Sequence, residues 1–422
     1  MAARYHRSVS DQAVSQGPAA ARSVLALVDS SPVLLLPSLL ACRERTGDRP
    51  LHVSLAGPIQ SDAAMQRLAG VLGRHGIPAT VLDRGPSLEE TVHTWLNGAG
   101  ADARSPLLDV SSASGGTATR AVLALQRDGR PYQLCWFHEA NNEVHFSSGG
   151  APEAHVIDVG SRRSVQSAVS PFDFMAIFGL ERAAEDPYCG VGRQRLVPLA
   201  TELLRVAMDH PAEYRQFRQI LGAARAQTDC PIPNDAIPGA LRPLIDELGF
   251  IEGWVRSDGR HTVFCGASDR IAVFFLSGGW LEVVVAEAIR LALPDHTVQT
   301  NCGATWGRRR RAEAEMDVAF VYHNALYLLS CKNDHLTDRF FPHLDRFRAL
   351  TAEFGESRTR PVLLSTTELE PRHIRRCDAY EIGQISGRPL LELVDRSLRE
   401  EPDALLKGLL TVSRGAPRAG LA

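Results

Sequence analysis

The sequence predicts an α/β protein with two sheet-containing domains joined by a small helical connector. Strand and helix patterns alternate regularly through the first third of the chain, which is typical of a doubly wound parallel sheet. From about Ser170 amphipathic helices replace this alternation, and from about Ile271 strands and helices are mixed again. With 422 residues, the chain has room for two or three domains with separate cores.

Four short apolar runs are predicted to be parallel strands, each followed by a helix. The strands are expected at 24–28, 51–55, 79–83 and 106–110, and the helices at 33–45, 61–74, 87–96 and 114–125. A hairpin formed by 133–137 and 143–146 closes the sheet. Parallel sheets of this kind bind ligands at the carboxyl ends of their strands, where Ser30-Ser31 and the segment Ser111 to Thr117 are expected.

The remainder of the chain predicts a connector and a second α/β domain. Helices at 196–207, 212–224 and 241–248, followed by a hairpin around Asp258-Gly259, resemble a small winged-helix-like connector. The expected elements beyond it are a strand at 271–276, a helix at 279–293, adjacent strands at 315–321 and 327–332, a helix at 344–354 and a strand at 361–365. The predicted segments are a disordered leader at 1–22, domains at 23–168, 169–268 and 269–412, and a tail at 413–422.

Composition excludes several classes of protein. The chain carries 46 basic and 49 acidic residues, so any binding of an anionic partner must come from local patches. Its eight cysteines include no CxxC pair, which argues against a zinc ribbon and against a disulfide framework. No apolar run approaches the ~20 residues of a membrane span, and residues 1–22 lack the apolar core of a signal peptide. We therefore expect a cytoplasmic protein with no membrane partner.

The two adjacent strands of the second domain carry acidic residues and a lysine. Alternate residues of a strand share a face, so Glu315 points with Asp317, and Ser330 points with Lys332. Burial of Asp317 requires compensation, either by a divalent cation or by a salt bridge with Lys332 alone. Lys332 either stabilises charge on a reacting phosphate or is a strand-end surface residue. Glu315 is either a second metal ligand or a solvated residue.

Glu282 lies on the apolar stripe of the predicted helix 279–293, among Val285 and Ile289. Glutamate is rarely buried without a partner, so this position indicates a functional carboxylate. The alternative is a side chain that turns toward the amide dipoles at the helix start. The combination of Glu282, Asp317 and Lys332 favours a metal site.

The order of helix Glu282, strand Asp317 and next-strand Lys332 resembles the PD-(D/E)xK nuclease fold. Together with the strand tips Val28 to Pro32 and Ser114 to Thr117, it is similar to CRISPR-associated ancillary nucleases with an N-terminal CARF domain. The resemblance implies a Rossmann-like CARF domain, the connector and a restriction-endonuclease-like domain. It also implies a homodimer that binds cyclic tetra-adenylate and cleaves DNA, RNA or both with Mg²⁺ or Mn²⁺, in type III CRISPR antiviral defence.

The resemblance assigns roles to individual residues. The implied metal ligands are Glu282, Asp317 and Glu315, while Lys332 and Ser330 join the first two in catalysis. The implied effector-binding residues are Ser30, Ser31, Ser112, Ser114, Gly115, Gly116 and Thr117.

Two positions depart from the family pattern. Ser330 stands where the family often has an acid; a hydroxyl can still hold a metal-bound water, and Glu315 could supply the missing carboxylate. If that acid is strictly required, the domain instead grips nucleic acid without cutting it. Ala118 stands where a polar residue often follows the glycines, which leaves phosphate contacts to backbone N–H groups and hydroxyls.

Two further motifs have alternative interpretations. The Gly115-Gly116 turn lacks the third glycine of a dinucleotide fingerprint, so it is either an effector loop or a structural turn. Arg308, Arg309 and Arg310 precede the acidic strand and suit the phosphates of a nucleic acid, or they form a solvated turn.

Overall fold

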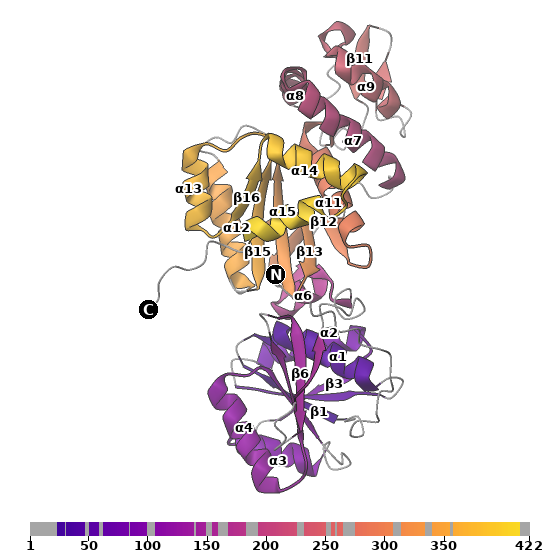
Figure 1. Cartoon of the computed structure of the whole chain (residues 1–422). Helices are drawn as coiled ribbons and strands as arrows, with labels where there is room; N and C mark the ends of the chain where they lie inside the picture. Colours follow the sequence, from indigo (N-terminus) through magenta and orange to yellow (C-terminus); the bar gives the residue numbers. More distant parts are fainter. Residues whose placement is uncertain are drawn as a thin grey trace, which may run out of the picture. The chain divides into compact units, whose positions relative to one another are not determined.

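The chain forms two compact units, Met1–Val159 and Gly160–Ala422 (Figure 1). The computed structural model describes residues 23–29, 31–46, 50–58, 62–83, 85–98, 106–138, 141–148, 154–158, 168–182, 193–225, 232–249, 255–257, 260–264, 275–306, 314–333, 340–354 and 358–413. Within these ranges no helix is long and apolar enough to cross a membrane.

The first unit contains a seven-stranded sheet of order β3-β2-β1-β4-β5-β6-β7. Its strands are β1 (Ser23–Val28), β2 (His52–Ala56), β3 (Ala79–Val81), β4 (Leu107–Ser112), β5 (Gln133–His138), β6 (Glu143–Ser148) and β7 (Ala154–Asp158). The helical elements are η1 (Pro32–Leu34), α1 (Leu35–Thr46), α2 (Asp62–Arg74), α3 (Leu88–Asn97) and α4 (Gly115–Asp128). Strands β1 to β5 pair in parallel, whereas β5, β6 and β7 pair in antiparallel fashion.

Local sequence explains the boundaries of the helices in this unit. The Ser87 hydroxyl accepts a hydrogen bond from the Glu90 amide at the start of α3, which satisfies an otherwise unpaired N–H group. Helix α4 ends at Gly129, which has the left-handed φ of 78° that favours glycine. Leu25 and Leu27 of β1 pack with α3 and α4 in one apolar core. The four predicted strand–helix pairs and the hairpin are therefore confirmed.

The second unit contains a six-stranded sheet of order β16-β15-β14-β13-β12-β8. Its strands are β8 (Leu180–Arg182), β12 (Val298–Trp306), β13 (Ala314–Tyr322), β14 (Ala325–Lys332), β15 (Thr359–Ser365) and β16 (Gly383–Ser386). Its helices include α6 (Pro171–Ile177), α11 (Trp280–Ala292), α12 (Phe341–Glu353), α13 (Pro371–Ala379), α14 (Arg388–Arg399) and α15 (Ala404–Ser413). Helices α11, α14 and α15 share one apolar core with the sheet.

The connector predicted from sequence corresponds to helices and a small separate sheet. Its elements are α7 (Arg193–Asp209), α8 (Pro211–Arg225), β9 (Ile232–Pro233), η3 (Asn234–Ala236), η4 (Gly239–Leu241), α9 (Arg242–Gly249), β10 (Val255–Ser257) and β11 (His261–Phe264). The three strands pair in antiparallel fashion. Residues 169–182, predicted to belong to this segment, include α6 and β8, and β8 pairs with β12 of the large sheet.

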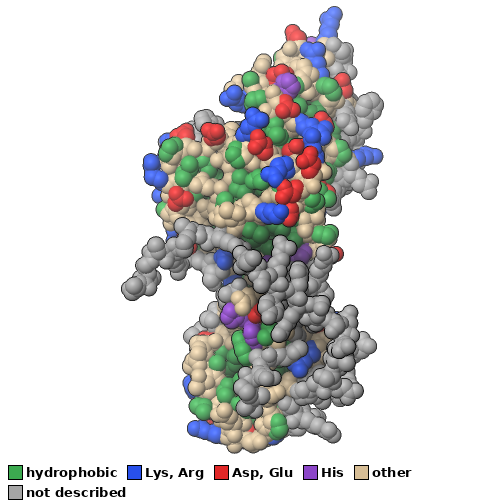
Figure 2. Space-filling view, in the orientation of Figure 1, with side chains coloured by type: hydrophobic (Ala, Val, Ile, Leu, Met, Phe, Trp, Pro, Cys, Tyr) green, Lys and Arg blue, Asp and Glu red, His purple; other side chains and the backbone are tan. Residues whose placement is uncertain are grey.

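The predicted strand 271–276 is wrong at its last two residues. Phe275 and Leu276, at the end of the expected strand 271–276, begin the π-helical turn η5 (Phe275–Gly279) that leads into α11; residues 271–274 lie outside the described ranges. A short apolar run is compatible with a buried helical segment as well as with a strand. Figure 2 shows basic and acidic side chains interspersed on the visible face of this unit, in keeping with the near-neutral net charge.

Candidate active site and effector edge

Asp317 is the centre of the candidate active site. Antiparallel pairing aligns Val318 of β13 with Leu329 of β14, which brings Asp317 beside the end of β14. One oxygen of Asp317, Oδ2, accepts hydrogen bonds from Lys332 Nζ at 2.9 Å, the Cys331 amide at 2.6 Å and Ser330 Oγ at 3.3 Å. The residue is only 6% exposed. The ion pair between Asp317 and Lys332, one of the two alternatives offered by the sequence, is therefore present within a wider set of contacts.

Strand alternation places the side chains of Asp317, Ser330 and Lys332 on the face of the sheet opposite α11, the helix that carries Glu282. Val318, Leu329 and Cys331 belong to the apolar core beneath α11, so Asp317 and Lys332 point to the other face. Cys331 is buried, and burial together with the nearby acids raises the pKa of its thiol well above the usual value. The Cys331 thiol is therefore protonated at neutral pH, and its backbone N–H group serves the site.

Glu282, in the first turn of α11, lies near the same strand end. It is 7% exposed, and its negative charge helps to raise the pKa of both Cys331 and Lys332. Burial favours the neutral form of Lys332, but the charge and hydrogen bond of Asp317 outweigh burial and raise the pKa of the ammonium. Lys332 is consequently a cation at neutral pH. The structure thus brings Asp317, Ser330 and Lys332 into direct contact, with Glu282 close enough for its charge to act on Lys332.

His343, in the first turn of α12, completes the polar cluster and was not predicted. Its Nε2 lies 3.0 Å from Ser330 Oγ, so Ser330 connects His343 with Asp317. Burial, with the adjacent Lys332, lowers the pKa of His343 to about 4. The imidazole is therefore neutral at physiological pH. The only signal in the sequence was a histidine that follows Pro342 at the start of a helix. No local sequence pattern relates this histidine to Ser330 in β14.

Tyr214 of α8 links both elements that carry the candidate site. Its hydroxyl accepts hydrogen bonds from Trp280 Nε1 and Asn333 Nδ2, and donates to the Leu276 carbonyl at 3.2 Å. The Tyr214 and Trp280 rings also meet edge to face, with centroids 5.9 Å apart. Because Trp280 is two residues from Glu282 and Asn333 follows Lys332, this single hydroxyl anchors both ends of the site.

The donor set fits a hard divalent cation. Glu282 and Asp317 contribute two buried carboxylates, and Lys332 contributes one positive charge. Carboxylate oxygens are the ligands preferred by Mg²⁺ and Mn²⁺, and an added cation would offset the remaining negative charge. Glu315 lies in β13 opposite Gly303; the structure describes its backbone but not its side chain. Arg308, Arg309 and Arg310 lie outside the described residues.

The predicted effector residues of the first unit gather around Asp29. Asp29 Oδ2 accepts hydrogen bonds from the Ser114 amide at 3.1 Å and from Thr117 Oγ1 at 3.0 Å. Hydrogen bonding from Ser114, which outweighs partial burial, lowers the pKa of Asp29. Ser112 Oγ accepts hydrogen bonds from the amides of Asp29 and Ser31, both at 3.3 Å. Ser30 lies outside the described residues.

The glycines of this edge are open to solvent on their side-chain side. A Cβ atom at Gly115 or Gly116 would meet no other atom within 4 Å. Packing inside the unit therefore does not require glycine at either position. The space over the start of α4, beside the hydroxyls of Ser114 and Thr117, is available to a bound group.

A buried aspartate supports this edge from beneath. Asp109 of β4 is fully buried and accepts hydrogen bonds from Ser38 Oγ at 2.5 Å and from the Ser111 amide at 2.9 Å. Burial raises the pKa of Asp109 to about 6, although the serine hydrogen bonds oppose the shift. Ser111 Oγ in turn accepts from the Phe137 amide at 2.9 Å. These bonds fix β4 to α1 and β5 next to Ser112.

Comparison with solved structures identifies the fold. Protein VC1899 from Vibrio cholerae superposes with a TM-score of 0.70, at 18% identity over 93% of this chain and 99% of that chain. Can2 from Sulfobacillus thermosulfidooxidans, solved in complex with cyclic tetra-adenylate, superposes with a TM-score of 0.62, at 14% identity over 92% of this chain and 99% of Can2. The chain shares the fold of Can2.

The likeness to Can2 extends over nearly the whole chain, so it includes both units. The predicted fold class is thereby confirmed at the level of architecture: an α/β domain with a largely parallel sheet is followed by a second, mixed α/β domain. No protein-family model and no curated protein matches the chain by sequence.

Proposed function

We propose that the chain is a metal-dependent nuclease, activated by cyclic tetra-adenylate, that acts in type III CRISPR antiviral defence in the cytoplasm. The observation that carries this proposal is the ion pair of 2.9 Å between buried Asp317 and half-buried Lys332, within reach of the charge of buried Glu282. The fold shared with Can2, which was solved with cyclic tetra-adenylate, supports the choice of activator. The second unit cleaves and the first unit senses.

The carboxylates of Glu282 and Asp317, with Glu315, hold Mg²⁺ or Mn²⁺. When bound, the ion lowers the pKa of a coordinated water and offsets charge on the scissile phosphate. Lys332 reaches the site as an ammonium and stabilises the charge that develops on the phosphate. Ser330, held between Asp317 and His343, positions water at the place where related nucleases often have an acid. Arg308, Arg309 and Arg310 bind backbone phosphates of a DNA or RNA substrate.

The first unit binds the phosphates of the cyclic nucleotide at the start of α4. Backbone N–H groups at a helix N-terminus attract anions, and Gly115 and Gly116 leave room for close approach. Ser31, Ser112, Ser114 and Thr117 surround this position, and Ser30 binds the same ring. Two chains form a homodimer that binds one ring across its two-fold axis, because a symmetric ring suits a symmetric pair of sites.

Ser330 favours a second candidate function, an effector-sensing protein that binds nucleic acid without cutting it. Ser330 is buried and already engages Asp317 and His343, so it supplies a hydroxyl where the active family pattern often supplies a carboxylate. In this case the Asp317–Lys332 pair is structural, and the site binds the phosphates of a nucleic acid without cleaving it.

A cleavage assay separates the two functions. The full chain is incubated with supercoiled plasmid, single-stranded DNA or RNA, with Mn²⁺ and with or without cyclic tetra-adenylate. We expect cleavage only when Mn²⁺ and cyclic tetra-adenylate are both present, and we expect EDTA to abolish it. Gel retardation without cleavage in all three substrates supports the binding function. Cleavage that is independent of the cyclic nucleotide contradicts the proposed activation.

A further inference from the structure

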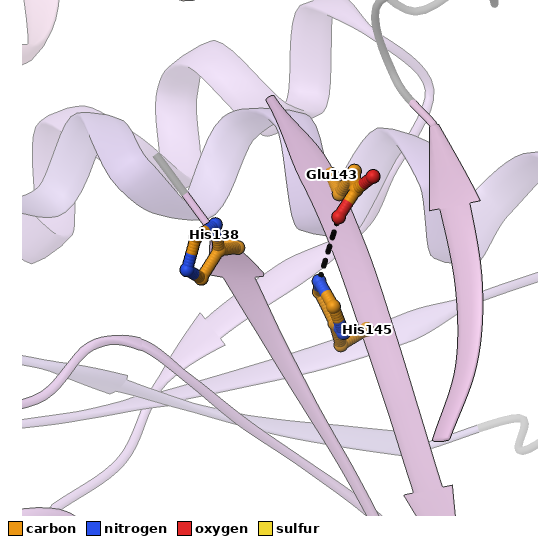
Figure 3. Close-up of side chains that lie close together, drawn as sticks. All are labelled: His138, Glu143 and His145. Carbon is orange, nitrogen blue, oxygen red and sulfur yellow. Dashed lines mark hydrogen bonds and ion pairs between the residues drawn. The ribbon is translucent and has the colours of Figure 1, made fainter. Parts of the chain in front are cut away.

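The hairpin of the first unit carries a second cluster of ligand-forming side chains. His138 ends β5, and Glu143 and His145 lie on β6 (Figure 3). The strand register pairs His138 directly with Glu143, and His145 is two residues further along β6 on the same face. One ligand atom from each of the three residues lies within 4.8 Å of the others.

We propose that His138, Glu143 and His145 bind a Zn²⁺-class transition metal ion. Two imidazole nitrogens and one carboxylate oxygen are a donor set that zinc uses when one coordination position stays open to water or a ligand. Imidazole favours zinc over Mg²⁺ and Ca²⁺, which prefer oxygen ligands. The site therefore differs in chemistry from the carboxylate centre of the second unit.

Two of the three ligands are already held at a suitable separation. Glu143 Oε2 and His145 Nε2 are 3.1 Å apart. Two ligands on a tetrahedral zinc ion are about 3.4 Å apart for bonds of about 2.1 Å, so this pair can accept an ion with little movement. The His145 ring is also stacked on Trp136 at 5.2 Å, and Asn141 Nδ2 donates to Glu143 Oε2 at 3.3 Å.

His138 supplies the adjustable ligand. It is exposed, and its ring centroid lies 5.6 Å from that of His145. Rotation of an exposed side chain costs little, so His138 can close on an ion held by the other two. The simpler explanation is an ion pair between Glu143 and His145 in which His138 takes no part, and this explanation predicts no loss of metal when His138 is replaced.

A metal ion bound by the cluster would act on the end of β5, which adjoins the effector edge. Phe137, the residue before His138, donates its amide to Ser111 Oγ of β4, next to Ser112 of the effector edge. A metal bridge between β5 and β6 would therefore fix the strand end that adjoins this edge. The cluster itself is complete within the described residues of one chain.

Metal binding by the full-length protein without a polyhistidine tag tests the proposal. Chelator-treated Asp317→Asn protein, in excess Mg²⁺ to occupy remaining oxygen sites, is titrated with ZnCl₂ by calorimetry. In a separate metal-free sample, CoCl₂ is added in place of ZnCl₂ to record the visible absorption of a tetrahedral centre. We expect one ion per chain, with affinity at least about 10-fold weaker in His138→Gln and in His145→Gln, since loss of one of three ligands removes a coordinate bond.

His52→Gln is the matched control, because His52 is an exposed histidine on β2 of the same unit. Circular dichroism of every variant establishes that the fold is retained. Loss of zinc in both cluster variants with retention in His52→Gln supports the site. The proposal is overturned if His138→Gln leaves the zinc affinity unchanged, or if the Asp317→Asn protein with its cluster intact binds no zinc.

Discussion

Each unit buries one aspartate beside its candidate binding site, and the two are satisfied in opposite ways. Asp109 is fully buried and its partners are neutral, namely the hydroxyl groups of Ser38 and Ser111, the Cys135 thiol and a backbone amide. Asp317 is nearly as buried, but one of its partners is the ammonium of Lys332 at 2.9 Å. A second carboxylate, Glu282, also lies near Lys332.

The difference shows what each aspartate does. A carboxylate with only neutral donors is costly to ionise, so burial raises the pKa of Asp109 to about 6, and the residue acts as a pin between β4 and its neighbours. A carboxylate beside a lysine and a second acid forms a charged centre that can exchange partners with a metal ion and a phosphate. Burial alone therefore does not distinguish the two aspartates. The charge of their partners does, and it is the basis on which we propose Asp317 as the functional one.

Replacement of Asp317 tests the charged centre most severely. Asp317→Asn keeps the shape of the side chain but removes its charge, so we expect the cleavage rate to fall by at least about 10²-fold, as for other losses of transition-state electrostatics. Binding of cyclic tetra-adenylate should be unchanged, because the effector residues belong to the other unit. Single-turnover cleavage and calorimetry measure the two quantities.

Asp345→Asn is the control for this experiment, because Asp345 is an exposed aspartate paired with Arg376. Its loss should leave cleavage at the parent rate. Parent-level cleavage by Asp317→Asn would show that the Asp317–Lys332 pair is only structural.

Asp109 should give the first unit an unusual dependence of stability on pH. Its pKa is about 6 in the folded chain, against 3.8 for an unperturbed aspartate, so between these values the folded carboxyl keeps a proton that the unfolded one has lost. The free energy of unfolding should consequently fall as the pH rises from about 4 to 6, by about 3 kcal/mol in total, and stay lowered above pH 6. In Asp109→Asn this decrease should be absent.

Denaturant titrations at several pH values, followed by tryptophan fluorescence, measure this effect. Asp128→Asn provides a contrast. In the parent chain the hydrogen bond from Arg130 lowers the pKa of Asp128, so the contribution of Asp128 to stability is lost as the pH falls, the opposite direction to that of Asp109. The same pH dependence in the parent and Asp109→Asn would mean that Asp109 is solvated in solution.

Tyr214 tests whether the charged centre depends on its anchoring from α8. Tyr214→Phe leaves Trp280 Nε1 and Asn333 Nδ2 without this partner, and an unsatisfied buried donor costs about 1–3 kcal/mol. Because both residues adjoin the site, we expect a maximal cleavage rate about tenfold lower, a loss of about 1.4 kcal/mol in transition-state stabilisation, with unchanged effector affinity.

Tyr132→Phe is matched to this variant, because the Tyr132 hydroxyl accepts a hydrogen bond from Gln126 at 3.3 Å in the other unit. It should lower stability and leave the cleavage rate unchanged. If Tyr214→Phe likewise lowers stability alone, its hydroxyl has no part in positioning the site.

Local patterns were sufficient to predict the charged centre but not its supports. Asp317 and Lys332 interrupt apolar strands, and Glu282 interrupts an apolar helix face, so polarity in an apolar context marked all three. Tyr214 is separated by 66 residues from Trp280 and by 119 from Asn333, and the partners of Asp29 are 85 and 88 residues away. No periodicity or spacing encodes contacts of this range.

The missed strands have a similar explanation. The segment Val298–Trp306 contains polar and small residues and a glycine, yet it forms β12 because β13 and β8 pair with it on either side. Strand β16 pairs in parallel with β15, and its four residues are too few to show an alternation of apolar and polar side chains. In both cases tertiary pairing overrides weak strand propensity.

Ser330 gives the smallest expected effect and the sharpest distinction between the two candidate functions. Its hydroxyl connects Asp317 with His343 but carries no charge, so Ser330→Ala should lower the cleavage rate only about threefold, as for the loss of one hydrogen bond of about 0.7 kcal/mol. Ser330→Glu adds a carboxylate next to Asp317, and we expect it to lower the Mn²⁺ concentration needed for half-maximal cleavage. Rates measured across a Mn²⁺ titration test both variants. Cleavage that appears only in Ser330→Glu would show that the parent chain binds nucleic acid without cutting it, and that the charged centre lacks one acid.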